Sequence, residues 1–173
     1  MLLNKQLFVL PPDEINAVGL QNLTYGSLSD TGLKTMAHTI KKYVKDPQIK
    51  GLDLGCGDGE LIYHLQNTLQ DSIWEGVEIS SHRVNAQTRD VTIWQGDMLD
   101  ENLRPYNVLH ADNLCLEDHV ADKLELKIAQ EFSGVYITYR TPENMTFIRK
   151  SKKLDTVVME TTWTKHPIHI YAI

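Results

Sequence analysis

The most informative segment of this chain is Gly51-Leu52-Asp53-Leu54-Gly55-Cys56-Gly57-Asp58-Gly59-Glu60. A short apolar run leads into three glycines at alternate positions, and residues 61–65 then place apolar side chains at helical spacing. This order predicts a strand, a tight turn and a helix, the first unit of a doubly wound α/β sheet that binds its ligand at the carboxyl edge. Glycine suits such a turn because it tolerates positive φ and lets the backbone lie close to a ligand.

The spacing of these glycines distinguishes two kinds of ligand. A dinucleotide-binding turn reads G-x-G-x-x-G and places a pyrophosphate at the helix N-terminus. Here the spacing is G-x-G-x-G, with Asp53 before it and Asp58 and Glu60 beside the last glycine. Three carboxylates would repel a pyrophosphate but suit a cationic ligand such as S-adenosylmethionine. We therefore interpret D-x-G-x-G-x-G as the first motif of a class I methyltransferase; the alternative is a structural turn in another α/β protein.

Length and composition limit the remaining possibilities. The chain has 173 residues, 42% of them apolar and 23% charged, which is typical of one globular domain. No window approaches the roughly 18 apolar residues of a membrane span, and the N-terminus lacks a secretory signal. We therefore expect an intracellular protein, cytoplasmic or nuclear, with no membrane partner. The net charge of −6 argues against binding nucleic acid through the overall field but permits a basic protein partner.

Two further acids follow predicted strands. Residues 73–79 read as the second strand, in which Glu78 comes 19 residues after Gly59. An acid at this position of a doubly wound sheet accepts hydrogen bonds from ribose hydroxyls. After a third strand at 91–94, Asp97 stands where it can accept from an adenine amino group, with Met98 packing on the ring. An ordinary turn is the alternative for Gly96-Asp97.

The fourth predicted strand, residues 107–111, opens onto Asp112-Asn113-Leu114. In class I methyltransferases this strand end faces the transferred methyl group. Enzymes that methylate DNA base amino groups carry Asn/Asp-Pro-Pro-aromatic here, and this chain does not. We therefore expect no free DNA substrate. The alternative for Asn113 is a helix cap before residue 117.

The rest of the chain completes one domain. Residues 1–24 are expected to form an N-terminal arm or cap, and residues 25–173 the methyltransferase domain. Helices are predicted near 33–44 and 117–132, a fifth strand at 134–139, and an antiparallel hairpin from 157–162 and 167–173. The basic run at 149–153 reads as a solvated loop, or else as a contact to phosphate or to an acidic partner. No metal site is predicted, and the sequence makes no prediction of oligomeric state.

With these pieces in place, the chain resembles the non-SET protein-lysine methyltransferases. These are the histone enzymes of the disruptor-of-telomeric-silencing (Dot-one) type and their small archaeal relatives. The resemblance runs from about Thr24 to the C-terminus. The family's motifs are matched, in order, by Tyr25-Gly26-Ser27, residues 53–59, Gly76-Val77-Glu78, Gly96-Asp97-Met98, Asp112-Asn113-Leu114, Trp163-Thr164, Pro167 and Tyr171.

The resemblance implies a Rossmann-like class I fold, S-adenosylmethionine as cofactor, and lysine side chains of a basic protein as substrate, with histones or nucleosomes possible. It implies that the cofactor is held by Tyr25, Asp53, Gly55, Gly57, Glu78, Asp97, Met98 and Asn113. It also implies a narrow lysine channel whose catalytic residues are Asn113, Tyr25, Tyr171 and Trp163.

The chain departs from the family at several of these positions. Ser27 replaces a glutamate, and Leu114 and Leu116 replace phenylalanines. Ile170 precedes Tyr171 where the histone enzymes have a tyrosine pair. These changes leave open a broad-specificity protein, small-molecule or RNA methyltransferase, or a cofactor-binding subunit with a decayed channel. No dedicated base is evident, so we expect catalysis by alignment and exclusion of water.

Overall fold

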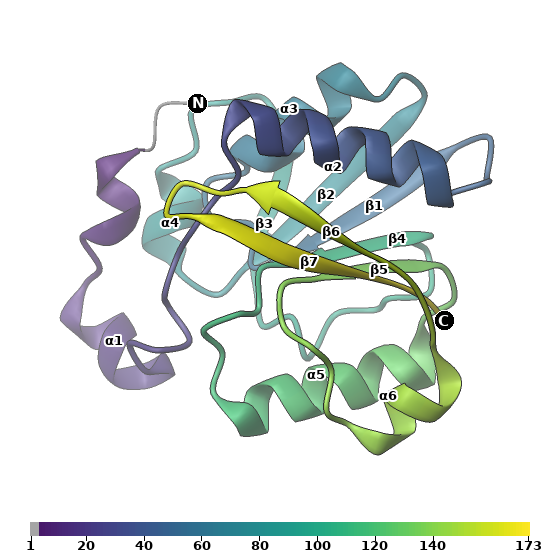
Figure 1. Ribbon diagram of the computed structural model, residues 1–173. Coiled ribbons are helices and arrows are strands. Elements are labelled where there is room, and N and C mark those ends of the chain that lie inside the picture. Colours follow the sequence, from purple (N-terminus) through teal and green to yellow (C-terminus); the bar gives the residue numbers. More distant parts are fainter. Residues whose placement is uncertain (1–3) are drawn as a thin grey trace.

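The computed structural model describes residues 4–173, which form a seven-stranded sheet covered by helices on both faces (Figure 1). The strand order is β3-β2-β1-β4-β5-β7-β6. The strands are β1 (Ile49–Leu54), β2 (Ser72–Glu78), β3 (Thr92–Gln95), β4 (Val108–Ala111), β5 (Val135–Thr138), β6 (Lys152–Glu160) and β7 (Lys165–Ala172). The first five strands are parallel, and β7 pairs antiparallel with both β5 and β6. This arrangement confirms the predicted doubly wound sheet with an antiparallel C-terminal hairpin.

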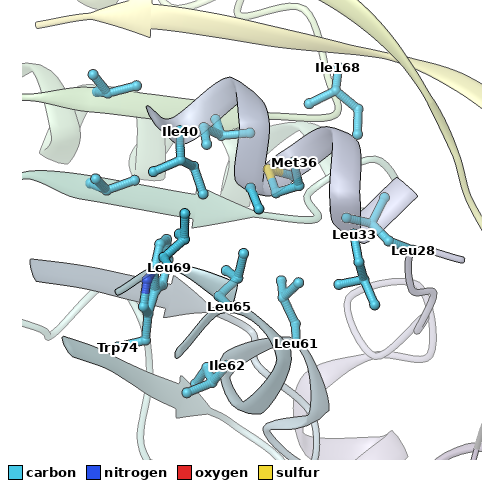
Figure 2. Packing of buried hydrophobic residues seen from close by; sticks show 14 of the residues in the cluster. Leu28, Leu33, Met36, Ile40, Leu61, Ile62, Leu65, Leu69, Trp74 and Ile168 are labelled. Atoms are coloured by element: carbon cyan, nitrogen blue, oxygen red, sulfur yellow. The ribbon is translucent and has the colours of Figure 1, made fainter. Parts of the chain in front are cut away.

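The helices divide between the two faces of the sheet. Helices α2 (Asp30–Tyr43) and α3 (Glu60–Thr68) cover one face, and α5 (Asp118–Glu131) and α6 (Met145–Lys150) cover the other (Figure 1). Figure 2 shows Met36 and Ile40 of α2 close to Leu61 and Leu65 of α3 in the first core cluster. The helix predicted near 33–44 therefore corresponds to α2, which buries a stripe of apolar residues. Among the described residues, none of the helices has the length and apolar character that crossing a membrane requires.

The basic run differs from its predicted loop. Arg149 and Lys150 form the last turn of α6, and Lys152 already begins β6, which starts five residues earlier than predicted. The Lys150 Nζ atom donates a hydrogen bond to the Ala129 carbonyl at 3.1 Å. A short helix cap at Asn144, whose side chain accepts from two backbone N–H groups, starts α6. The sequence reading missed this helix because six residues are too few to show a periodicity.

The N-terminal arm, residues 4–24, contains the 3-10 helix η1 (Lys5–Phe8) and α1 (Pro12–Val18). Proline occupies the first position of α1, where its missing N–H costs no intrahelical hydrogen bond. The arm runs beside α4 (Ser81–Asn85), which follows β2 (Figure 1). Leu7 and Leu23, near the two ends of the arm, are each 1% exposed, so the arm is anchored at both ends.

Candidate functional site

A cavity of about 300 Å³ lies at the carboxyl ends of β1, β2 and β4. Its walls come from four parts of the chain: the glycine turn after β1, the ends of β2 and β3, the loop between β4 and α5, and the N-terminal arm. A second cavity, of about 20 Å³, lies beside it and shares four lining residues, Tyr25, Gly26, Gly55 and Asp112. Ligands bind at this edge of open α/β sheets, so both cavities lie where the sequence predicted a site.

The glycine turn is held against β2 by its own backbone. The N–H groups of Gly55 and Cys56 both donate to the Val77 carbonyl, at 2.9 and 3.1 Å. Gly55 has φ of 85°, and a Cβ placed on it would meet no atom within 4 Å, so the turn is open to the cavity here. Gly57 has φ of 60°, and a Cβ there would lie 2.4 Å from Cε2 of Tyr25. The turn therefore leaves room for a ligand at Gly55 and is covered by Tyr25 at Gly57.

Glu78, at the end of β2, is buried and lines the large cavity. One carboxylate oxygen accepts from the Gly57 N–H at 2.9 Å, and the other accepts from the Ser80 N–H at 3.0 Å. Burial raises the pKa of this carboxyl, while the Ser80 hydrogen bond and nearby Arg83 oppose the rise. The backbone thus holds the carboxylate in one orientation at the cavity wall.

Asp97 and Met98 follow β3 and line the same cavity as Glu78. One Asp97 oxygen accepts from the Leu99 N–H at 2.8 Å, which places the side chain in a short turn. Met98 packs against the core cluster under α5. The structure therefore brings together Gly55, Glu78, Asp97 and Met98, as the predicted cofactor site requires.

Asp53 lies deeper than predicted. It is 3% exposed and lines the small cavity. Its carboxylate accepts from Nδ1 of His110 at 2.7 Å, and Nε2 of His110 lies 3.3 Å from the hydroxyl of Tyr139. The Tyr139 ring stacks on His166 at 6.1 Å. A buried chain of polar groups from three strands and the loop after β5 therefore underlies the small cavity. The sequence reading missed His110 and Tyr139, since only strand pairing places His110 opposite Asp53.

Asp112 is the other residue that the sequence reading left out of the site. It directly follows β4, lines both cavities and is partly buried. Burial raises its pKa to about 6, although His110 opposes the rise. A signal was available, because Asp112 is the first polar residue after a fully buried strand.

Asn113 lies where the sequence placed it, just after β4 at the large cavity, but its side chain is engaged with β5. Its Oδ1 accepts hydrogen bonds from the Thr138 hydroxyl at 2.8 Å and from the N–H groups of Tyr139 and Arg140, both at 3.1 Å. Its Nδ2 donates to the Tyr136 hydroxyl at 3.3 Å. The side chain lines the large cavity, but its amide holds the end of β5 and does not cap α5. Its amide is therefore already occupied, contrary to the predicted role in orienting an amine.

Tyr25 lies in the site, and Trp163 packs on the next residue, Gly26. Tyr25 lines both cavities, and burial raises the pKa of its hydroxyl. Trp163, in the turn between β6 and β7, lies on Gly26: a Cβ on that glycine would be 2.1 Å from the Trp163 ring. The indole remains 44% exposed. Segments near the two ends of the chain therefore pack together at Gly26, although Trp163 itself lines neither cavity.

The prediction for Tyr171 is wrong. Tyr171 pairs with Tyr136 near the amino end of β5 and lines neither cavity. Its ring packs edge-to-face on Phe147 of α6 at 5.3 Å, within the core. Because β7 runs antiparallel to β5, its first residues reach the site edge and its last residues lie at the opposite edge. His169, paired with Thr138, is the β7 residue beside the end of β5.

Solved structures with this fold include several methyltransferases. Magnesium protoporphyrin IX methyltransferase (ChlM) from Synechocystis PCC 6803, with bound SAH, has a TM-score of 0.62 at 14% identity, over 92% of this chain and 96% of that one. Geranyl diphosphate methyltransferase, in complex with GPP and sinefungin, has a TM-score of 0.57 at 14% identity, over 80% and 78%. Streptomyces venezuelae DesVI has a TM-score of 0.52 at 20% identity, over 75% and 59%. These likenesses show the class I methyltransferase fold.

Sequence comparison adds the family. No curated protein sequence gives a significant match. The matches described here do not name a protein-lysine methyltransferase, so the predicted kinship with the Dot-one type stays a prediction. A family model described as "Methionine biosynthesis protein MetW" matches residues 35–126, which include the glycine turn, Glu78, Asp97 and Asp112. Because this match covers more than half of the 173 residues, the chain belongs to the MetW family.

Proposed function

We propose that this protein is an S-adenosylmethionine-dependent methyltransferase whose acceptor is a primary amine on a slender chain, with a protein lysine as the expected substrate. One observation carries the proposal. The cavity at the carboxyl edge of a class I methyltransferase fold is lined by the open glycine turn, Glu78, Asp97 and Met98 together. The family match spans the turn and these three residues.

The residues fit the cofactor by their chemistry. The Glu78 carboxylate suits two ribose hydroxyls, and Asp97 with Met98 suits an adenine ring. The open space at Gly55 and the acids Asp53 and Asp112 suit the cationic end of S-adenosylmethionine. When bound, this cofactor supplies an electrophilic methyl group.

The small cavity supports an amine as acceptor. A space of about 20 Å³ holds about one small group, such as the amine at the end of an alkyl chain. It is bordered by Tyr25, Tyr139 and the carboxylate of Asp112, which can accept a hydrogen bond from a bound ammonium or amine. At pH 7 a free lysine loses its proton at a cost of about 4–5 kcal/mol. Desolvation of the amine in the small cavity lowers its pKa and hence that cost, while the Asp112 carboxylate orients the amine by accepting a hydrogen bond from it.

The acceptor can be tested by transfer of a labelled methyl group. Histones, intact nucleosomes, free lysine and other small amines, total RNA and DNA are offered side by side, and products are mapped by mass spectrometry. We expect label on lysine side chains and none on free DNA. Label confined to RNA, or to oxygen or carbon atoms, would overturn the amine proposal. Tight binding of S-adenosylmethionine without transfer to any acceptor would favour a cofactor-binding subunit.

A small-molecule acceptor is the second candidate. It is favoured by the MetW description and by the solved structures, two of which are named for small-molecule methyltransferases. Label on free amines at a rate above that on histones would favour this candidate over a protein substrate.

A further inference from the structure

We infer that Arg83 is a positioning residue that couples ligand binding at Glu78 to closure of the N-terminal arm over the large cavity. The inference rests on the proposed cofactor, because Glu78 is the residue expected to hold its ribose. Arg83 belongs to α4, and the sequence reading assigned it no role.

The Arg83 guanidinium contacts both ends of the arm, Glu78 and the Tyr25 ring. Its Nε donates to the Leu7 carbonyl at 3.1 Å, and its Nη2 donates to the Leu23 carbonyl. Its Nη1 lies 3.7 Å from Oε1 of Glu78, and its Cζ lies 5.2 Å from the centre of the Tyr25 ring. Leu7 and Leu23 belong to the two ends of the arm, so Arg83 joins both ends to the end of β2.

The burial of Arg83 shows that these contacts are not incidental. The residue is 4% exposed, and a buried charge is retained in a protein only when it is paired and hydrogen-bonded. Its partner charge, Glu78, is 3% exposed. The fork of the guanidinium is needed here, because an ammonium could not reach two separate carbonyls and the carboxylate in fixed directions.

Closure of the cavity depends on the same arm. Ala17, Val18, Asn22 and Thr24 line the large cavity, and the Asn22 side chain accepts from the Glu117 N–H at 2.9 Å across it. A ligand on Glu78 therefore touches a carboxylate whose counter-ion also holds the arm. Coupling of this kind is reciprocal: a ligand that orders the arm binds more weakly when the arm is released.

A second tether supplies a matched control. Glu14 of α1 accepts from the hydroxyls of Ser80 and Ser81, at 2.5 and 2.7 Å, and from the His82 N–H at 3.1 Å. It holds the arm to the start of α4 without touching Glu78. Glu14→Ala therefore removes a tether and reaches Glu78 only indirectly, through Ser80, whereas Arg83→Met removes a tether and the counter-ion of Glu78.

The experiment measures S-adenosylhomocysteine binding by calorimetry and hydrogen exchange of residues 4–24, on the full chain with and without this ligand. In the wild type, the ligand should slow exchange across the arm. Arg83→Met should raise the Kd by about tenfold or more, the range for lost charged hydrogen bonds, and abolish the ligand's effect on the arm. Glu14→Ala should speed exchange of the unliganded arm, yet retain protection by the ligand and a Kd within about fivefold of wild type.

Arg83→Lys keeps the charge and the aliphatic stem, so it tests the inference even if Arg83→Met does not fold. Its Kd should fall between those of the wild type and Arg83→Met. A wild-type Kd in both Arg83 variants, or equal effects of Arg83→Met and Glu14→Ala on both readouts, would overturn the coupling. Absence of S-adenosylhomocysteine binding by the wild type would instead overturn the proposed function, and this inference with it.

Discussion

The half of the site proposed to hold the cofactor, at the ends of β1, β2 and β3, is built largely from main-chain groups. Gly55 donates to Val77, Gly57 donates to Glu78, and Asp97 accepts from the residue two positions later. The half proposed to hold the acceptor, at the ends of β4 and β5, is built from side chains far apart in the sequence. There His110 joins Asp53 to Tyr139 across 57 and 29 residues.

This difference separates two kinds of substitution. In the first half, the backbone already holds the side chains that face the cavity, so their loss should act mainly on ligand binding, with an added cost in stability at Glu78, which balances the buried Arg83. In the second half, side chains hold one another, so the loss of one should act on stability and on chemistry together. The following predictions test that division.

The largest effect is expected for Glu78→Gln, in the first half. The amide keeps the size of the carboxylate but removes the charge opposite Arg83 and one acceptor, so S-adenosylmethionine binding should weaken by about 1–3 kcal/mol. Calorimetry measures the affinity, and circular dichroism checks that the fold is retained. Wild-type affinity in a folded Glu78→Gln protein would remove Glu78 from the ribose site.

Asn113→Ala should be next, and in the second half it should act on stability. The substitution removes an acceptor shared by three donors at the end of β5 and leaves the Tyr139 N–H without one, which should lower the free energy of unfolding by about 1–3 kcal/mol. The sequence reading instead expects a loss of turnover. Melting temperature and single-turnover rate, measured on one sample below the melting transition, separate these outcomes. A stable but inactive variant would restore Asn113 to a catalytic role.

Asp112→Asn should change the pH dependence of methyl transfer. With a pKa of about 6, Asp112 is charged above that pH and neutral below it, so transfer to amines should fall as the pH drops through 6. The variant should lose this step and turn over about tenfold more slowly at pH 7.

The stability of Asp112→Asn should change in the opposite direction to its turnover. Because the folded pKa is higher than the unfolded one, the charged carboxyl disfavours the folded state as the pH rises from about 4 to above 6. Asp112→Asn should therefore melt at a higher temperature than the wild type at pH 7, with little difference at pH 4. An unchanged pH–rate profile in Asp112→Asn would contradict the assignment of Asp112 to the acceptor site.

The smallest effect is expected for Tyr171→Phe. The ring packs on Phe147 in the core, so the phenylalanine should keep turnover within about twofold and stability within about 0.5 kcal/mol. Trp163→Ala is the contrasting variant, since its partly exposed ring packs on Gly26, a residue that lines both cavities. It should lower transfer to proteins more than cofactor affinity. A large loss of turnover in Tyr171→Phe would return Tyr171 to the acceptor site.

The two halves also differ in how far they could be predicted. Gly55, Glu78, Asp97 and Met98 were identified from glycine spacing and from acids at strand ends, and the structure places all four around one cavity. Tyr171 was misplaced because the family motif implies that a last-strand tyrosine reaches the site, whereas its antiparallel register with Tyr136 puts it at the other edge. His110, Tyr139 and Arg83 carry no local motif and could not be found this way.

The sequence by itself determined the sheet, the glycine turn and the acids that follow β2 and β3. These features depend on local periodicity, on positive φ at glycine and on strand ends, which short stretches of chain encode. Only the tertiary structure decided that His110 lies on Asp53, that Arg83 binds both ends of the arm beside Glu78, and that Asn113 serves β5. The physical reason is that each of these contacts depends on strand register and on burial, which exist only once distant segments have packed together.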